Sequence, residues 1–312
     1  MKYNNMYYKG FPIDKLVNDK RLIYESPSSF NGLIKALFAN NEQGFAYDPN
    51  DLTTLYQDVA GTVPVTAAGQ PVGLLLDKSK GLVVGSERVT NGGFANGSAG
   101  WLGINGTDEV VSGGFLNFTN AVAGNPNAYQ QNVIEPSKWY KISFRVANRT
   151  AGAVYLMAYT VDPANAIITA QISTNGVYSA ILRAPIDANG SLGIRVIANS
   201  SLSITDVSVK ELAGNHAYQT TSSMRPLLVA SPQRLDYDTV DDKLITNLPA
   251  QLTNCTVIRS VPNVGTQILT NQTIPTPYND NTDHCGLIVI NRALTATETS
   301  QITKLFNKAA GV

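Results

Sequence analysis

The sequence predicts a mainly β protein with a few short helices, in which one β-sandwich is inserted into a second β domain. The sandwich is indicated by short apolar or alternating runs, each bounded by Gly, Asn, Pro or Asp. These runs cover residues 115–118, 139–146, 154–161, 167–172, 178–182 and 192–197. From Tyr140 to Val146 every second residue is apolar, which predicts a strand with one buried face.

Composition narrows the class of protein. The chain has 312 residues, of which 43% are hydrophobic, enough for ordinary cores. Only 15% are charged, against about 25% in typical globular domains, which favours a β-rich extracellular or virion protein over a cytosolic enzyme. The 23 basic side chains balance the 23 acidic ones, so no net field attracts nucleic acid or anionic lipid. We therefore expect no nucleic-acid partner.

The sequence has no clear targeting signal and only two cysteines. No run approaches the roughly 20 apolar residues of a membrane span, so we expect no membrane insertion. The start of the chain has no apolar core of a signal peptide, so export by the general secretory route is not indicated. Cys255 and Cys285 are too few for a disulfide framework. They could pair, but for a protein assembled in a reducing cytoplasm we expect free, partly buried thiols.

Residues 1–43 are predicted to form an anchor or assembly segment. Residues 6–13 and 15–24 read as small hairpins with turns at Lys9-Gly10 and Asn18-Asp19. Residues 27–40 read as an amphipathic helix capped by Ser26. The hairpins look like elements at the ends of phage tail and fibre proteins, and a strand pair on the chain's own sheet is the alternative.

The next block carries the most specific resemblance. Asp48 and Pro49 predict a capped short helix, and about 40 residues from Gly44, including the run GQPVGLLLDKS, closely resemble a block of bacteriophage tail and other virion structural proteins. In such proteins a concanavalin-like sandwich follows directly. Here a similar sequence, GNHAYQTT and later LDYDTVDDKL, starts only at Gly214. The resemblance implies a discontinuous concanavalin-like virion domain, residues 44–85 plus 213–312.

The intervening residues 86–212 have matching ends. The opening VTNGGF, followed by Trp101, and the closing TDVSV resemble the two edges of galactose-binding-like jelly rolls of the carbohydrate-binding-module type. A fold whose ends emerge together can be inserted into a host loop at little cost. The resemblance places Trp101 and Tyr140 in the core. It also implies a structural calcium held by backbone oxygens near Phe94 and by Asp206, although Asp206 could equally be a turn residue.

The same resemblance implies where sugar would bind. A sugar platform uses exposed aromatic faces beside polar groups. Once the expected core residues are set aside, Tyr129, Tyr155 and Tyr159 remain as glycan-binding candidates.

The C-terminal part departs from the concanavalin-like pattern because few residues follow Leu244, which puts that family's ligand loops in doubt. The chain ends in a predicted helix. Thr295 and Glu298 form a capping box, and Ile302, Leu305 and Phe306 give the helix an apolar face.

The candidate catalytic residues do not favour an enzyme. His216 and His284 are the only histidines, and neither belongs to a recognisable set of metal ligands. Crowded carboxylates could suggest glycosidase chemistry, but the resemblance places them at a strand and turn; they are Asp236, Asp238, Asp241 and Asp242. No nucleophile elbow, metalloprotease motif or phosphate-binding loop is present. We expect no catalytic residues and no cofactor apart from the implied calcium.

Together these observations predict a non-enzymatic bacteriophage virion structural protein, assembled in the bacterial cytoplasm. It would sit in the tail or a fibre and carry an adhesin-like module for host-surface attachment. Its expected partners are other virion proteins, copies of itself, as a trimer by analogy, and a host cell-surface glycan. The alternatives are a head-surface decoration protein and a protein whose primary activity is glycan binding.

Overall fold

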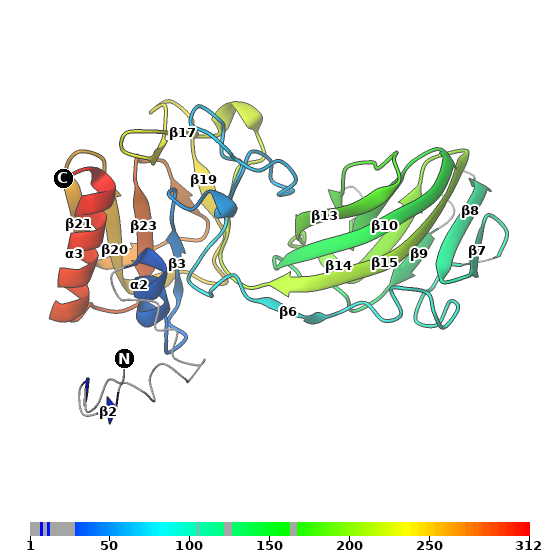
Figure 1. Ribbon diagram of the computed structural model, residues 1–312, viewed down its shortest axis with the longest axis horizontal. Helices are drawn as coiled ribbons and strands as arrows, with labels where there is room; N and C mark the ends of the chain where they lie inside the picture. Colours follow the sequence, from blue (N-terminus) through cyan, green and yellow to red (C-terminus); the bar gives the residue numbers. More distant parts are fainter. Residues whose placement is uncertain (1–6, 9–10, 13–28, 105, 122–126, 163–166) are drawn as a thin grey trace, which may run out of the picture.

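The computed structural model describes residues 7–8, 11–12, 29–104, 106–121, 127–162 and 167–312. From residue 29 onward they form two β-rich bodies side by side, with helices α2 and α3 on one of them (Figure 1). We call the body built from residues 84–212 the module, and the other body the base. The mainly β fold class predicted from the sequence is confirmed.

The module consists of two antiparallel sheets. The larger has the strand order β13-β10-β15-β8-β7, with β6 also paired to β15. Its strands are β6 (Val84–Glu87), β7 (Glu109–Ser112), β8 (Phe115–Ala121), β10 (Trp139–Ala151), β13 (Gly176–Arg183) and β15 (Ser200–Leu212). The smaller has the order β12-β11-β14-β9. Its strands are β9 (Asn127–Gln130), β11 (Val154–Thr160), β12 (Ile167–Ile168) and β14 (Ala188–Val196). Each of the six predicted runs overlaps a strand, whereas β7 and β9 were not predicted.

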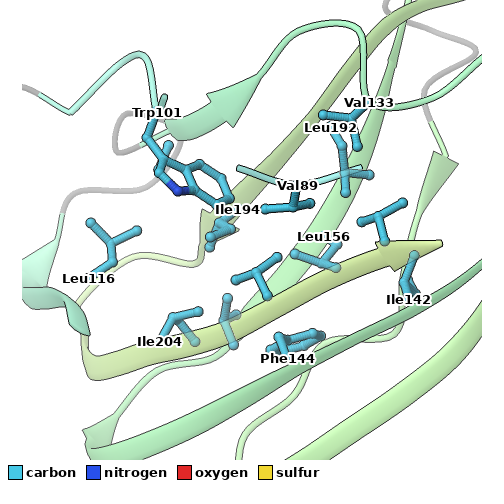
Figure 2. Packing of buried hydrophobic residues seen from close by; sticks show 14 of the residues in the cluster. Val89, Trp101, Leu116, Val133, Ile142, Phe144, Leu156, Leu192, Ile194 and Ile204 are labelled. Carbon is cyan, nitrogen blue, oxygen red and sulfur yellow. The ribbon is translucent and has the colours of Figure 1, made fainter. Parts of the chain in front are cut away.

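One hydrophobic core lies between these sheets (Figure 2). Tyr140 and Ile142 on β10 face Leu156 and Ile194 of the smaller sheet, and all four are almost fully buried. The alternation predicted for β10 is therefore confirmed. Trp101 also belongs to this core, as predicted, and lies against Phe94 with 5.1 Å between ring centroids.

The chain enters and leaves the module through neighbouring strands. Glu87 on β6 pairs with Lys210 on β15, and Val84 pairs with Leu212. Beyond the last pair the Ala213 amide donates to the Val83 carbonyl over 3.1 Å. The two connections to the base therefore lie side by side (Figure 1).

The base contains two larger antiparallel sheets and a two-stranded one, β17-β18. The first has the order β21-β20-β23-β3, and its strands are β3 (Gly44–Tyr47), β20 (Leu252–Val261), β21 (Gly265–Ile274) and β23 (Gly286–Ile290). The second has the order β22-β19-β16-β5-β4, and its strands are β4 (Leu55–Tyr56), β5 (Leu74–Leu75), β16 (Ala217–Tyr218), β19 (Leu244–Thr246) and β22 (Tyr278–Asp280). The remaining elements are β17 (Leu227–Val229), β18 (Arg234–Asp236), the 3-10 turn η3 (Ser222–Met224) and α3 (Ala296–Ala310).

The base has two apolar layers. Between its two larger sheets, Phe45 and Leu75 from before the module pack with Leu244 and Val289 from after it. On the other side of the first sheet, one face of α2 and one face of α3 cover β20 and β23. Both layers contain residues from both sides of the module in the sequence.

Among the N-terminal elements, the hairpin predicted at 6–13 is confirmed, whereas the predicted helix cap is not. Strands β1 (Tyr7–Tyr8) and β2 (Phe11–Pro12) pair antiparallel, whereas the hairpin predicted at 15–24 lies outside the described residues. Helix α2 spans Phe30–Leu37 and is capped by Ser29, whose hydroxyl accepts from the Gly32 amide over 3.1 Å. The predicted cap at Ser26 is wrong because Ser29 supplies the same hydroxyl three residues later.

The short helix predicted after Asp48 is also misplaced. It is a single 3-10 turn, η1 (Leu52–Thr54), capped by Asp51. The Asp48 carboxylate accepts from the Lys78 ammonium over 3.0 Å and from the Asn50 amide over 3.1 Å. This buried ion pair could not be predicted from local pattern, because its partners are 30 residues apart.

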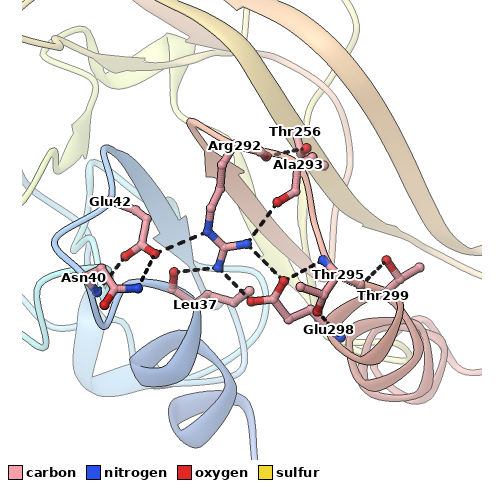
Figure 3. A network of polar contacts seen from close by, with 9 residues as sticks. All are labelled: Leu37, Asn40, Glu42, Thr256, Arg292, Ala293, Thr295, Glu298 and Thr299. Carbon is pink, nitrogen blue, oxygen red and sulfur yellow. Dashed lines mark hydrogen bonds and ion pairs between the residues drawn. The ribbon is translucent and has the colours of Figure 1, made fainter.

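Helix α3 begins at the predicted capping box and is tied to the base by Arg292 (Figure 3). The two guanidinium Nη atoms donate to the two Glu298 oxygens over 2.7 and 2.9 Å, and Nη2 also donates to the Leu37 carbonyl over 3.0 Å. Its Nε donates to Glu42 over 3.3 Å. Hydrogen bonds from Arg292 hold the pKa of Glu298 down at about 2.

The two cysteines are free, as expected, but they are fully buried and not partly buried. The Cys285 amide donates to the Ser260 carbonyl over 2.8 Å, so Cys285 lies beside Ser260. Cys255 is on the same strand as Ser260, five residues earlier. At about 3.3 Å per residue this separation is about 16 Å, far beyond the roughly 7 Å Cα limit for a disulfide.

Candidate functional site: an aromatic face on the module

The smaller sheet of the module turns one face to the core and the other outward. On β11, Val154, Leu156 and Ala158 lie in the core, so Tyr155, Met157 and Tyr159 point to the outer face because side chains alternate along a strand. The same alternation on β14 and β9 gives the outer face three more residues. We call this set the aromatic face, and it consists of Tyr129, Tyr155, Met157, Tyr159, Gly193 and Arg195.

Strand register makes the aromatic face continuous. Gly193 on β14 pairs with Met157 on β11 and with Tyr129 on β9. Arg195, two residues further along β14, pairs with Tyr155. Side chains on directly opposed residues lie about 5 Å apart at Cβ. One row of the face thus contains Met157, Gly193 and Tyr129, and the next contains Tyr155 and Arg195. Tyr159 lies two residues beyond Met157 along β11.

Gly193 makes room for the ring of Tyr159. A Cβ placed on Gly193 would lie 2.7 Å from Cε2 and 3.0 Å from the hydroxyl oxygen of Tyr159. The first separation is shorter than real Cβ contacts and the second is tighter than most of them, so the ring occupies space that a side chain at this position would need. The hydroxyl end of Tyr159 thus lies directly over the backbone of the central strand.

Tyr129 stands beside this ring at an angle. The centroids of Tyr129 and Tyr159 are 6.0 Å apart and their planes are inclined by 58°. All three tyrosines are partly exposed. Outside the same edge of the sheet, the main chain of Leu102 pairs with Tyr129 through hydrogen bonds of 2.9 and 3.0 Å, which fixes the strand that carries Tyr129.

Tyr159 and Arg195 influence each other electrostatically at the middle of the face. Burial raises the pKa of Tyr159, and the positive charge of Arg195 opposes the rise. The Tyr159 hydroxyl is therefore protonated at neutral pH and can donate as well as accept. The Arg195 Nη1 atom lies 3.5 Å from the Met157 sulfur, so the guanidinium is directed along the sheet toward the middle of the face.

The structure thus brings together the three tyrosines that the sequence suggested, from two strands about 30 residues apart. Sequence reasoning missed Gly193 and Arg195. The sequence does contain a signal for these two residues. Leu192 and Ile194 alternate with them and mark the buried face of β14, which leaves Gly193 and Arg195 on the outer face. Of the other aromatic rings of the module, Tyr178 lies on the larger sheet, against Phe144 at 5.9 Å between centroids, and Trp139 is buried where the module meets the base.

The predicted calcium residues do lie together. Asp206 is exposed on β15, and its Oδ1 is 4.0 Å from the Cβ position of Gly93, next to Phe94. The Phe94 ring is buried, so only its backbone could be a ligand. Calcium takes six to eight oxygens, and Asp206 supplies at most two of them. The backbone carbonyls of this turn would have to supply most of the rest, and calcium binding here stays a prediction.

The two histidines lie in the base and are buried. His216 Nδ1 accepts from the Asp77 amide over 2.9 Å, as expected of a structural residue, and its ring meets Trp139 of the module edge-on at 5.4 Å. Burial lowers the pKa of His216 to about 3. His284 Nε2 lies 2.7 Å from the buried Asp280 carboxylate, which also accepts from the Tyr237 hydroxyl over 2.8 Å.

The crowded carboxylates form a turn. Asp238, Asp241 and Asp242 lie between β18 and β19, with carboxylate oxygens within 4.8 Å of one another. One oxygen of Asp238 accepts from the amides of Val240, Asp241 and Asp242. Asp236 is on β18, where it pairs with Arg234 over 2.8 Å. The carboxyl groups therefore stabilise local backbone.

A cavity of about 820 Å³ in the base is a weaker candidate. It lies between α2 and residues 78–83. Its buried cation, Lys78, is already held by Asp48 at 3.0 Å and Asp51 at 2.7 Å. Polar groups in this cavity thus bind one another.

Neither α2 nor α3, the described α-helices, has the length and apolar character of a membrane span.

Comparison with known proteins gives only distant likenesses. No family model and no curated protein matches the chain. Among solved structures, one comprises the CBM22-1 and GH10 modules of a Clostridium thermocellum xylanase with bound xylohexaose. It is 18% identical with a TM-score of 0.31, and the match covers 41% of this chain and 29% of the xylanase structure.

Two further neighbours are single binding modules. A CBM4 structure is 20% identical with a TM-score of 0.30, covering 39% of this chain and 99% of that one. The xylan-binding CBM22-1 domain of a Paenibacillus barcinonensis protein is 11% identical with a TM-score of 0.32, covering 42% and 97%. TM-scores this low do not establish a shared fold. The module is a β-sandwich by its own strand order. Nothing in the comparisons points to a bacteriophage origin.

Proposed function

We propose that the protein binds carbohydrate through the aromatic face of the module. The observation that supports this proposal is the pair formed by Tyr159, whose ring lies over Gly193, and Tyr129, inclined beside it at 6.0 Å. The edges of sugar rings carry hydroxyls, whereas their faces carry C–H groups with partial positive charge. Such a face is attracted to the negative face of an aromatic ring.

The surrounding groups suit a polar ligand better than an apolar one. Each tyrosine presents a hydroxyl at the end of its ring, and Arg195 adds donors between them. Aromatic surface with a few polar groups that fix orientation is typical of a ligand site. The tyrosines of this face sit on strands of one sheet, which hold their spacing more firmly than loops would.

A glycan array probed with the full-length protein tests the proposal. The strongest hit is then titrated by calorimetry against the parent protein and single alanine variants at Tyr129, Tyr155 and Tyr159. Loss of a stacking ring should weaken binding about tenfold or more, which corresponds to about 1.4 kcal/mol. The matched control is Val177→Ala, which removes an exposed apolar side chain from the larger sheet.

The two results have distinct meanings. Weaker binding by the tyrosine variants, with unchanged melting and with Val177→Ala behaving like the parent, supports the proposal. An array without hits, or a hit that all three tyrosine variants bind normally, overturns it.

Several expectations drawn from the sequence now stand only as proposals. We propose that the protein binds without catalysing a reaction. The virion role, its partners, self-association and location rest on the sequence resemblance alone, and no comparison supports them. Glycan binding, the alternative drawn from the sequence, has the aromatic face in its support and is the function we favour.

A further inference from the structure

We propose that the ligand of the aromatic face is an acidic polysaccharide, and that Arg195 selects it by binding the carboxylate of a uronic acid. This inference rests on the proposed function, because it assigns a chemical class to the ligand of the same site. It follows from the position of the guanidinium relative to the rings.

Arg195 lies on the middle strand of the face and turns its side chain toward the rest of it. It lies on β14, the strand between β11 and β9, and pairs with Tyr155. Its side chain turns toward the neighbouring row, where Nη1 lies 3.5 Å from the sulfur of Met157. Met157 in turn pairs with Gly193, over which the Tyr159 ring lies. A ligand that spans Tyr155 and Tyr159 therefore crosses the guanidinium.

The charge of Arg195 reaches the ring on which the sugar would stack. The guanidinium partly opposes the rise in the pKa of Tyr159 that burial causes. The charge of the guanidinium therefore acts at the position where a sugar ring would stack. A neutral sugar gains hydrogen bonds there, but an anionic sugar gains the charge interaction as well.

The chemistry of the side chain favours a carboxylate. Arginine stays charged at any physiological pH, and its planar fork matches the two oxygens of a carboxylate. Charge-assisted hydrogen bonds are roughly twice as strong as neutral ones. In a uronic acid the carboxylate projects from the ring edge, so the sugar face can stack on a tyrosine while the carboxylate meets a group lying between the rings.

Matched polymers separate charge from shape. Polygalacturonate and alginate are each compared with their own carboxyl-reduced forms, which keep the chain but lose the charge. Full-length protein is titrated with all four at low and at physiological salt. We expect each acidic form that binds to bind at least tenfold more tightly than its reduced form, and we expect higher salt to narrow the difference.

Variants assign the preference to Arg195. Arg195→Gln should weaken binding of the acidic form by a larger factor than binding of the reduced form, which loses only neutral hydrogen bonds, and Arg195→Lys should keep part of the preference for the acidic form. Lys141→Gln is the matched control, because it removes the same charge from an exposed position on the larger sheet. A role limited to covering Met157 would give equal losses for acidic and neutral polymers.

The outcomes also separate this inference from the proposed function. Binding of neutral glycans on the array, with no preference for any acidic polymer, overturns the role of Arg195 and leaves glycan binding standing. Absence of binding to every glycan and polymer overturns both.

Discussion

Gly193 shows how a missing side chain shapes the aromatic face. A Cβ at this position would collide with the ring of Tyr159 at 2.7 Å. Gly193 has no positive φ, so alanine is compatible with its backbone. Substitution should therefore act on the ring alone.

We predict that Gly193→Ala weakens glycan binding about as much as Tyr159→Ala does, although it retains all three tyrosines. The added methyl group pushes the Tyr159 ring away from the sheet, and alanine costs the strand no stability because glycine is the less favourable strand residue. Calorimetric titration gives the affinity, and thermal melting checks the fold. Unchanged affinity in a folded Gly193→Ala variant would show that the ring position does not matter.

His216 is the residue whose protonation should most affect the base. Its pKa is lowered by burial to about 3, from an ordinary value of 6.5. The unfolded chain therefore binds a proton between these pH values and the folded protein does not. The stability that neutral His216 contributes is present above pH 6.5 and is lost as the pH falls toward 3.

We predict that His216→Gln removes this loss. At pH 7 the variant should be less stable than the parent, because the contact with Trp139 is gone. Between pH 6.5 and 4 the difference should shift in favour of the variant by roughly 1.4 kcal/mol per pH unit. Burial raises the pKa of Asp77 to about 6, but Asp77 titrates in both proteins and cancels. Urea unfolding at several pH values measures the difference, and a constant difference would contradict the prediction.

The residues of the aromatic face show how far sequence reasoning extends. The three tyrosines were selected by excluding Trp101 and Tyr140, which the resemblance to the jelly-roll family places in the core. Arg195 and Gly193 were not selected because arginine and glycine in a strand are unremarkable alone. Their role depends on a register between β11, β14 and β9, and strand register across sequence gaps of this size is not encoded in local pattern.

At the scale of elements, helix caps were predicted unevenly. Thr295 and Glu298 lie three residues apart, so their reciprocal bonds can be recognised in the sequence. Asp48 and Asp51 are both acceptable caps by residue type, and both form ion pairs with Lys78, so the ion pair does not decide between them. Asp51 is the cap because its carboxylate accepts from the Thr53 amide inside the turn. Residue type alone thus left two candidates here, whereas the capping box of α3 left one.

Arg292 gives a test of how α3 is held on the base. We predict that Arg292→Lys lowers the free energy of unfolding by about 1–3 kcal/mol, because lysine cannot reproduce the bonds to both oxygens of Glu298. The pKa of Glu298 is about 2, below its usual 4.5, so this stability is present above pH 4.5 and is lost as the pH falls toward 2.

Urea unfolding at pH 7 and pH 3 checks both parts of this prediction. The gap between parent and variant should be smaller at pH 3. Lys304→Arg, an exchange on the exposed side of the same helix, is the control and should leave stability unchanged at either pH. A gap of equal size at the two pH values would mean that Glu298 is not the partner that matters.

At the scale of the molecule, the discontinuous base remains a prediction that can be tested directly. We expect deletion of residues 86–212, with Gly85 joined to Ala213, to leave a folded β-rich protein. Both apolar layers of the base contain residues from before and after the module. The splice is short because the Ala213 amide already bonds to the Val83 carbonyl over 3.1 Å.

The truncated protein should melt cooperatively but at a lower temperature than the parent. The deletion exposes Leu74, Leu76 and Tyr218, which pack against Trp139 and Ile181 of the module. Circular dichroism and calorimetry measure the fold and the transition. A product without a cooperative transition would count against the division into base and module.

The order of strands in the sheets could not be predicted from the sequence. Neighbours such as β10 and β15, or β20 and β23, are separated by long stretches of chain, and local pattern does not choose among the pairings open to them. The predicted sandwich and its boundaries came instead from turn residues and from resemblance at the two ends of the module. Turn residues and the resemblance thus predicted which elements form, but they did not predict how the strands are ordered in the sheets.

The paired strands β6 and β15 also determine how the protein would carry a mechanical load. In a string of modules, tension enters each one at its first residue and leaves at its last, which pulls the fold open from its ends. Here both connections leave the module at the same end, side by side. A pull between a glycan held on the aromatic face and the base would be divided between two strands, and it would not stretch the module from terminus to terminus.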